Sequence, residues 1–440
     1  MRRILYLAYH FPPIGGAGVQ RNAKFARYLP DFGYAPVVVT GTGGSAGRWT
    51  PTDETLCAEL SDEVEVHRSA GPEPPEGDGW RARAERWLGV PGPWSRWWAE
   101  RAAARAQALV ESCDVVYAAM APFVTAHVAA RIAHAAGKPW VADLQDPWAL
   151  DEMMVYPSSL HRSLDAGRMR SVLVTADAIV MNTPESAARV RLRFPELAGK
   201  LVFSIPNGFD AADFAGDLPE RDDRAFRIVH TGYLHTELGR RNRRAGRVAR
   251  MLGGTNGSVD IFTRSHVYLL EALDRLGAAG VELHLAGVLT ATDRDYAQHP
   301  AVRLRGYLPH AESVALIRSA DLLFLPMHNL PRGERMSIVP GKTYEYLASG
   351  RPILAAVPDG DARDLLEEAG SARVCRPDDV DAMAKIVGAE LERVRAGRPH
   401  RPPDDAVLER YERRRLTEQL AEVFDVVLGT PAKARDLVAT

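Results

Sequence analysis

The sequence Ile4-Leu5-Tyr6-Leu7-Ala8, followed by Gly15-Gly16-Ala17-Gly18 and a helical pattern over residues 19–29, decides the fold. A short apolar run predicts a buried strand, and glycines before a helix permit a tight turn. Amides in the first turn of that helix have no intrahelical partner, so they are available to a phosphate. The chain therefore opens as an α/β unit with either a phosphate-binding turn or a plain strand-to-helix turn.

Short apolar runs continue through the first half and alternate with helix-length segments. A parallel sheet needs a helix to return the chain between strands, so this alternation predicts a doubly wound domain. The further predicted strands are residues 37–40, 64–67, 115–119, 140–144, 178–181 and 201–205.

A polar stretch over residues 210–227 indicates a linker, after which the same pattern restarts. The sequence thus predicts two Rossmann-like domains, residues 1–210 and 211–403, that face a central cleft, with a helix at 404–428 packing back on the first. The second domain's strands are expected at 228–231, 281–286, 302–305, 322–325, 353–357 and 372–375, and helices at 267–276, 312–319, 343–348 and 380–395.

Composition narrows the function classes. A formal net charge of -2 gives no general attraction to nucleic acid or anionic lipid. Cys57, Cys113 and Cys375 are far apart and odd in number, which argues against a disulfide framework and a thiolate zinc site. The first apolar run is too short for a signal peptide, and no run of about 18 apolar residues occurs. We expect a cytoplasmic protein.

Two glycine-containing motifs each fail a familiar fingerprint. The dinucleotide pattern G-x-G-x-x-G would need glycine where Arg21 stands, which disfavours a nicotinamide cofactor. Gly341-Lys342-Thr343 would complete a P-loop only with glycine at Met336. What remains is Pro340 and Gly341 before a helix that we expect to carry Glu345 on its first turn. Glu345 would either accept ribose hydroxyls or contribute about 0.3–1 kcal/mol as an N-terminal charge.

Further motifs occur in a characteristic order. The chain resembles the retaining family-four glycosyltransferases of the GT-B fold, and within them the bacterial subgroup with the pattern V-P-x-K-x-Y-E-Y-L-A-x-G-x-P. The resemblance spans nearly the whole chain. The motifs after the first glycine loop are Asn207-Gly208-Phe209-Asp210, His230-Thr231-Gly232-Tyr233, Gly306-Tyr307-Leu308-Pro309, Ser319-Ala320-Asp321 and residues 340–352.

The resemblance implies transfer of a sugar, of the hexosyltransferase type, from a UDP-, GDP- or dTDP-sugar to an acceptor hydroxyl with retention of configuration. It implies front-face departure of the diphosphate without a protein nucleophile, metal or cofactor. The acceptor would be a sugar, a lipid-linked molecule or a small molecule, in cell-surface polysaccharide, glycolipid or natural-product biosynthesis. The implied donor-binding residues are Gly15, Gly16, Gly18, Gly232, Ser337, Gly341, Lys342, Thr343 and Glu345.

Three departures from the family pattern mark the catalytic region. Ser337 stands where the first glutamate of an E-x7-E pair is expected, with Glu334 nearby. Arg264 is the candidate for a basic residue that the family places after the strand opening the second domain. Asp146, in Gln145-Asp146-Pro147-Trp148, is a candidate near the acceptor or a turn carboxylate. His127 is either a packed helix residue or a catalytic one that relatives place similarly.

Two clusters allow alternative interpretations. Trp94, Trp97 and Trp98 would form either a peripheral membrane contact at the inner membrane face or part of the core. The arginines from Arg240 to Arg250 would form a solvated helix face or contact an anionic acceptor or membrane. Two other functions remain open, a sugar-nucleotide epimerase or hydrolase of the same fold, and a non-catalytic subunit of a glycosylation complex. No nucleic-acid partner is expected.

Overall fold

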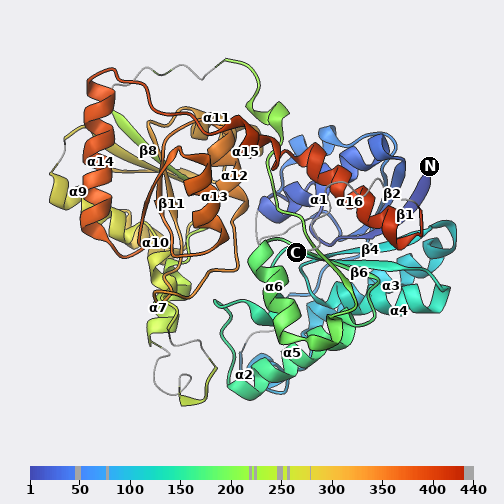
Figure 1. Cartoon of the computed structure of the whole chain (residues 1–440). Helices are drawn as coiled ribbons and strands as arrows, with labels where there is room; N and C mark the ends of the chain where they lie inside the picture. Colours follow the sequence, from blue (N-terminus) through green and yellow to red (C-terminus); the bar gives the residue numbers. More distant parts are fainter. Residues whose placement is uncertain are drawn as a thin grey trace. The chain divides into compact units, whose positions relative to one another are not determined.

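The computed structural model describes residues 1–44, 51–75, 79–217, 221, 225–244, 251–254, 258–277 and 279–430. It contains two compact units. Unit 1 comprises Met1–Asn207 and Arg413–Thr440, and unit 2 comprises Gly208–Glu412. Each unit is a parallel sheet with helices between its strands (Figure 1), which confirms the predicted pair of doubly wound α/β domains.

Unit 1 has a seven-stranded sheet in the order β3-β2-β1-β4-β5-β6-β7, with every neighbouring pair parallel. The reversal of strand order beside β1 is the switch point at which open α/β sheets bind ligands. Its strands are β1 (Arg2–Leu7), β2 (Tyr34–Thr40), β3 (Glu65–Arg68), β4 (Val115–Met120), β5 (Trp140–Leu144), β6 (Ala178–Met181) and β7 (Leu201–Ser204). Its helices are α1 (Ala17–Tyr28), α2 (Gly79–Trp87), α3 (Pro93–Leu109), α4 (Val124–Ala136), α5 (Ser159–Leu173), α6 (Pro184–Arg193) and α16 (Arg413–Val427).

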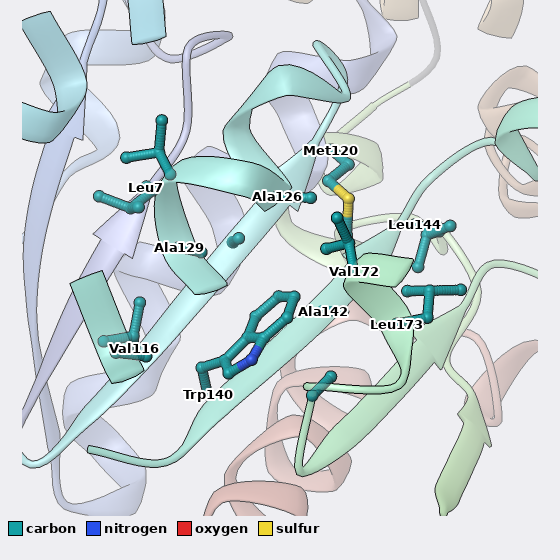
Figure 2. Close-up of a cluster of buried hydrophobic side chains, with 14 of the residues drawn as sticks. Leu7, Val116, Met120, Ala126, Ala129, Trp140, Ala142, Leu144, Val172 and Leu173 are labelled. Atoms are coloured by element: carbon teal, nitrogen blue, oxygen red, sulfur yellow. The ribbon is translucent and has the colours of Figure 1, made fainter. Parts of the chain in front are cut away.

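Alternate residues of the strands in unit 1 pack into two apolar cores, one on each face of the sheet. Leu5 and Leu7 of β1 pack into the first core, whereas Ile4 and Tyr6 pack into the second. The period-2 geometry of a strand produces this division. Figure 2 shows side chains of the first core from β1, β4, α4, β5 and α5.

The second core of unit 1 is closed by the last described helix. Leu416, Leu420 and Phe424 of α16 are fully or almost fully buried, at the spacing of one helix face. Burial of each contributes about 1.5–3 kcal/mol. The Phe424 ring lies 5.3 Å from that of Tyr34, and α16 runs beside α1 (Figure 1).

Where the sequence predicted one helix over residues 404–428, the structure has two. Residues 410–412 separate α15 (Asp405–Glu409) in unit 2 from α16 in unit 1. In this break the Phe209 amide donates to the Tyr411 carbonyl at 3.0 Å. The chain thus forms a short bridge at residue 412, opposite Phe209, instead of continuing the helix.

Unit 2 has a six-stranded sheet in the order β10-β9-β8-β11-β12-β13, again entirely parallel. Its apolar core lies between the sheet and the helices α9 and α14. The strands are β8 (Phe226–Thr231), β9 (Val281–Ala286), β10 (Val302–Gly306), β11 (Leu322–Pro326), β12 (Ile353–Ala356) and β13 (Ala372–Cys375). Its helices besides α15 are α7 (Thr236–Arg244), α9 (Val267–Leu276), α10 (Ala291–Tyr296), α11 (His310–Arg318), α12 (Gly341–Ala348), α13 (Asp361–Ala369) and α14 (Val380–Arg395).

Candidate functional site

The first turn of α12 and the end of β8 meet in unit 2. Pro340 is the N-cap residue of α12, and its extended backbone turns the chain into the helix at Gly341. The Thr231 amide at the end of β8 donates to the Tyr346 hydroxyl of α12 at 2.8 Å. This bond holds the helix start against the carboxyl end of the central strand, where ligands of parallel sheets bind.

Lys342 points from this first turn onto β8. Its Nζ lies 3.2 Å from His230 Nε2, and His230 Nδ1 lies 3.0 Å from the carbonyl oxygen of Phe324. A carbonyl only accepts, so Nδ1 carries the ring proton and Nε2 accepts from the Lys342 ammonium. The backbone of β11 thereby fixes the tautomer that receives the lysine.

The electrostatics around Lys342 favour an added anion. Burial, followed by the positive charge of Arg264, lowers the pKa of Lys342 to about 7, with Glu345 opposing the shift. Burial and the charge of Lys342 hold the pKa of His230 well below its ordinary value. Burial and Arg264 also lower the pKa of His235. The histidines are therefore neutral at pH 7, and the positive charge rests on Lys342 and Arg264.

Gly232 lies next to the Lys342 head group. Its φ of 94° lies in the region that favours glycine, and a Cβ at this position would stand 2.9 Å from Lys342 Nζ. Gly287 packs directly behind it, because a Cβ there would lie 2.5 Å from the Gly232 carbonyl oxygen. Gly232 thus leaves the space that the lysine head group occupies, and Gly287 lets the chain pack closely behind Gly232.

The other predicted residues of unit 2 differ in their burial and in their place on the helix. Thr343 is fully buried, and its Oγ1 has no hydrogen-bond partner within the described part of the chain. Ser337 is buried, with 1% of its surface exposed. The expectation that Glu345 lies on the first turn is wrong, because α12 begins at Gly341 and carries no acidic residue in that turn. Glu345 is half-buried one turn further along.

In unit 1 the glycine loop leads into α1. Gly16 is the N-cap residue of α1 with a φ of 110°, and Gly18 lies in the first turn. A Cβ on Gly18 would stand 3.0 Å from the Gln145 side-chain oxygen. The Gly15 amide donates to the Pro51 carbonyl at 3.1 Å, so this amide already has a partner.

A buried ion pair lies behind this loop, and the sequence interpretation missed it. Arg21 of α1 donates from Nε and Nη2 to the two carboxylate oxygens of Asp143 in β5, each at 3.0 Å, and both side chains are fully buried. Arg21 Nη1 also donates to the Pro206 carbonyl at 2.5 Å, and the Tyr117 hydroxyl donates to Asp143. Arg21 stands where the dinucleotide pattern requires glycine. It therefore links α1 to β5 and to Pro206, near the end of the first segment of unit 1.

The segment after β5 carries the predicted acceptor-side residue. Asp146 is exposed, next to Gln145, whose Nε2 donates to Asn22 Oδ1 at 3.0 Å. Two residues on, Trp148 has a φ of 51°, an uncommon backbone conformation for a bulky residue that often marks a functional site. The Trp148 ring stacks on Phe123, with centroids 4.7 Å apart.

His127 lies on the exposed side of α4 and does not belong to the core. Its ring meets the Trp148 ring edge to face at 6.1 Å. Partial desolvation, followed by the charge of Arg168, lowers the pKa of His127, so a neutral imidazole faces solvent at pH 7. His127 and Asp146 thus belong to neighbouring elements of unit 1, while Arg264 belongs to unit 2.

The tryptophan cluster proposed for membrane contact belongs to the core instead. Trp94 is 5% exposed and Trp98 is fully buried, with its indole N–H donating to Thr125 Oγ1 at 2.9 Å. Trp97 packs against the same core. Of the two interpretations of these residues, the structure therefore supports the core. They lie on the face of α3 that covers the sheet.

The described part of the arginine cluster forms ion pairs on α7. Arg241 contacts Glu237 at 2.9 Å, and Arg243 contacts Asp260 at 2.6 Å. The Arg243 guanidinium also lies 4.2 Å from the centre of the Phe262 ring. Residues 245–250 of this cluster lie outside the described part of the chain.

Among the described residues no group of three or more His, Cys, Asp or Glu side chains is arranged to hold a metal ion. None of the described helices is long and apolar enough to cross a membrane.

Comparison with known proteins gives two family matches. Residues 255–392 match the model described as "Glycosyl transferases group 1", and residues 15–208 match the "Glycosyl transferase 4-like domain". No curated protein matched the sequence.

Solved structures similar to this one share the GT-B fold at low sequence identity. The Anabaena protein Alr3699/HepE, solved with UDP and glucose, is 16% identical with a TM-score of 0.60, over 97% of this chain and 100% of that one. Sucrose-phosphate synthase from Thermosynechococcus elongatus is 13% identical with a TM-score of 0.64, over 98% and 100%. A putative UDP-N-acetylglucosamine 2-epimerase from Listeria monocytogenes is 12% identical with a TM-score of 0.57, over 99% of both chains. Such likeness shows the fold, which confirms the GT-B prediction.

Proposed function

We propose that this chain, whose two halves match glycosyl transferase family models, is a glycosyltransferase that holds the diphosphate of its nucleotide-sugar donor at Lys342 in unit 2. One observation carries the proposal. The Lys342 ammonium rests on a neutral histidine, over a glycine that leaves room for it, at the start of a helix. Such a start offers free amides and a partial positive charge to an anion.

The residues around Lys342 suggest how each part of the donor is held. Arg264, whose charge affects the pKa of both Lys342 and His235, would stabilise the developing charge of the leaving diphosphate. The buried hydroxyl of Thr343 is a ready donor to a phosphate oxygen. Glu345 would accept the ribose hydroxyls. We propose that these groups supply the stabilisation that other enzymes obtain from a metal ion.

The nucleotide is proposed to be uridine, guanosine or deoxythymidine diphosphate. Alr3699/HepE, which shares the fold, was solved with UDP and with UDP-glucose, which makes UDP-sugars the first donors to test. The acceptor hydroxyl would be activated from unit 1, where Asp146 and His127 lie on elements that flank Trp148. We propose transfer with retention of configuration, with no side chain as nucleophile.

Product analysis tests this function. The protein is incubated with UDP-, GDP- and dTDP-sugars, with and without sugar and lipid-linked acceptors, and products are followed by NMR at the anomeric carbon. We expect nucleoside diphosphate release that depends on acceptor and an anomeric configuration equal to that of the donor. An inverted product would contradict retention. A changed sugar without any acceptor would instead indicate an epimerase, and activity that appears only with a second subunit would indicate a partner role.

A further inference from the structure

One helix of unit 1 turns its apolar face outward. In α2 and the turn that follows it, Trp80, Ala84, Trp87 and Leu88 follow the i, i+4, i+7, i+8 spacing of a single helix face, and all four are exposed. Trp80 is 81% exposed, Trp87 59% and Leu88 74%. The apolar face of a helix in a globular protein normally faces the core. Among the α2 residues whose burial is described, Ala82 alone is buried.

The start of α5 extends this apolar surface. His161 Nε2 lies 2.6 Å from the Trp87 carbonyl oxygen, and the two rings are 4.9 Å apart. Arg168 Nη2 donates to the Gly89 carbonyl at 2.7 Å, so the end of α2 is fixed against α5. The neighbouring residues add exposed side chains, namely Leu160, Leu164, Val90, Met154 and Val155.

The apolar surface formed by α2, the start of α5 and residues 154–155, here called the α2–α5 surface, is unusually concentrated. It holds eight of the sixteen large apolar residues that are exposed in the described chain. Single exposed apolar residues are normal on a protein surface, whereas a contiguous group marks an interaction site. The core does not need these residues, since Trp94 and Trp98 of the next helix already cover the sheet.

The charge around the α2–α5 surface identifies the partner class. Residues 79–98 contain four arginines and one glutamate, and α5 contains three arginines and one aspartate, in a chain whose net charge is -2. Arg96 and Arg168 are exposed. Tryptophan and leucine on one side of a surface helix, in an arginine-rich stretch of sequence, match the interface of an anionic bilayer, where indole rings sit at head-group depth.

We propose that the α2–α5 surface docks on the surface of an anionic lipid bilayer. Trp80, Trp87 and Leu88 enter the head-group region, while the exposed Arg96 and Arg168 meet lipid phosphates. No helix crosses the membrane in this arrangement. The proposal does not depend on the sugar-transfer chemistry, because its evidence lies wholly in unit 1.

Vesicle binding tests the proposal with the full chain. Cosedimentation is measured with vesicles of phosphatidylcholine alone and with one-third phosphatidylglycerol. We expect binding to the anionic vesicles only, weakened by 0.5 M salt because the electrostatic part is screened. The triple variant Trp80→Ala/Trp87→Ala/Leu88→Ala should bind at least about tenfold more weakly, since three anchoring side chains are lost. Leu304→Ala, an equally simple change on the exposed edge of unit 2, should bind as wild type.

Several outcomes would overturn the proposal. These are equal binding to neutral vesicles, no binding to either, or a triple variant that binds as wild type. A concentration-dependent dimer that the triple variant abolishes would show that a second copy covers this surface instead. Circular dichroism and thermal unfolding establish that the variants are folded. A blue shift of tryptophan fluorescence on vesicles, lost in the triple variant, gives a second measure that needs no activity.

Discussion

Donor affinity should fall steeply as pH rises through neutrality, because Lys342 loses its proton there. Its pKa is lowered to about 7 by burial and by Arg264. A bound diphosphate supplies the negative charge that favours the ammonium form, so binding takes up a proton. The contribution of the lysine is therefore complete below pH 7 and is lost above it. His230 and His235 stay neutral across this range, since the pKa of each is lowered.

The size of the effect follows from the titration of one group. If only the ammonium form of Lys342 holds the donor, the apparent Kd rises about tenfold per pH unit above 7, or about 1.4 kcal/mol. Between pH 6 and pH 8.5 the loss is about 30-fold. At pH 7, binding should take up about half a proton.

Isothermal titration calorimetry measures both quantities. A nucleotide sugar is the right ligand, because its diphosphate has no group that titrates in this range. Titration at pH 7 in two buffers with different ionisation enthalpies gives the proton uptake. Lys342→Arg keeps a charge at every pH, so its affinity should be nearly independent of pH, while Lys342→Gln should be weak throughout. Equal wild-type affinity at pH 6 and 8.5, or no proton uptake, would refute this explanation.

Three further substitutions separate local effects. Gly232→Ala should lower donor affinity at least about tenfold by displacing the Lys342 head group, and titration with the same donor checks it. Arg21→Met should lower the free energy of unfolding of unit 1 in urea by about 3–5 kcal/mol, because Asp143 is left buried without its partner, whereas Arg21→Met/Asp143→Leu should recover most of that loss. A single-variant cost below about 1 kcal/mol would contradict this account. Thr343→Val should leave thermal stability unchanged and weaken donor binding, and unchanged binding would remove the hydroxyl from the site.

The fold could be predicted from the sequence because its strands are short, continuous and apolar. The predicted strands at 140–144, 178–181, 281–286 and 372–375 coincide with β5, β6, β9 and β13. In a sheet covered on both faces, every residue of a central strand is buried, so the pattern is strong. The break at residues 410–412 could not be predicted, because the segments on both sides of it have helical periodicity. The feature that marks the break is a backbone hydrogen bond from the Phe209 amide to the Tyr411 carbonyl, which is distant in sequence.

The site was less predictable because its chemistry depends on contacts distant in sequence. The tautomer of His230 is fixed by a carbonyl in β11, and the space for the Lys342 head group depends on a glycine 110 residues away. Arg21 was interpreted only as a departure from a fingerprint, since nothing local reveals its pairing with Asp143. Two interpretations of Trp94, Trp97 and Trp98 stayed open for a related reason. The sequence shows that the segment from Trp80 to Trp98 is aromatic, but only packing shows which rings are buried.

Direct titration of the protein with UDP-, GDP- and dTDP-sugars at pH 6.5 tests the central claim that unit 2 holds a nucleotide-sugar donor at Lys342. The wild type should bind at least one of them, and Lys342→Ala should bind that donor at least about tenfold more weakly while unfolding at the same temperature. Binding of none of the donors, or equal binding by the Lys342→Ala variant, would contradict the account.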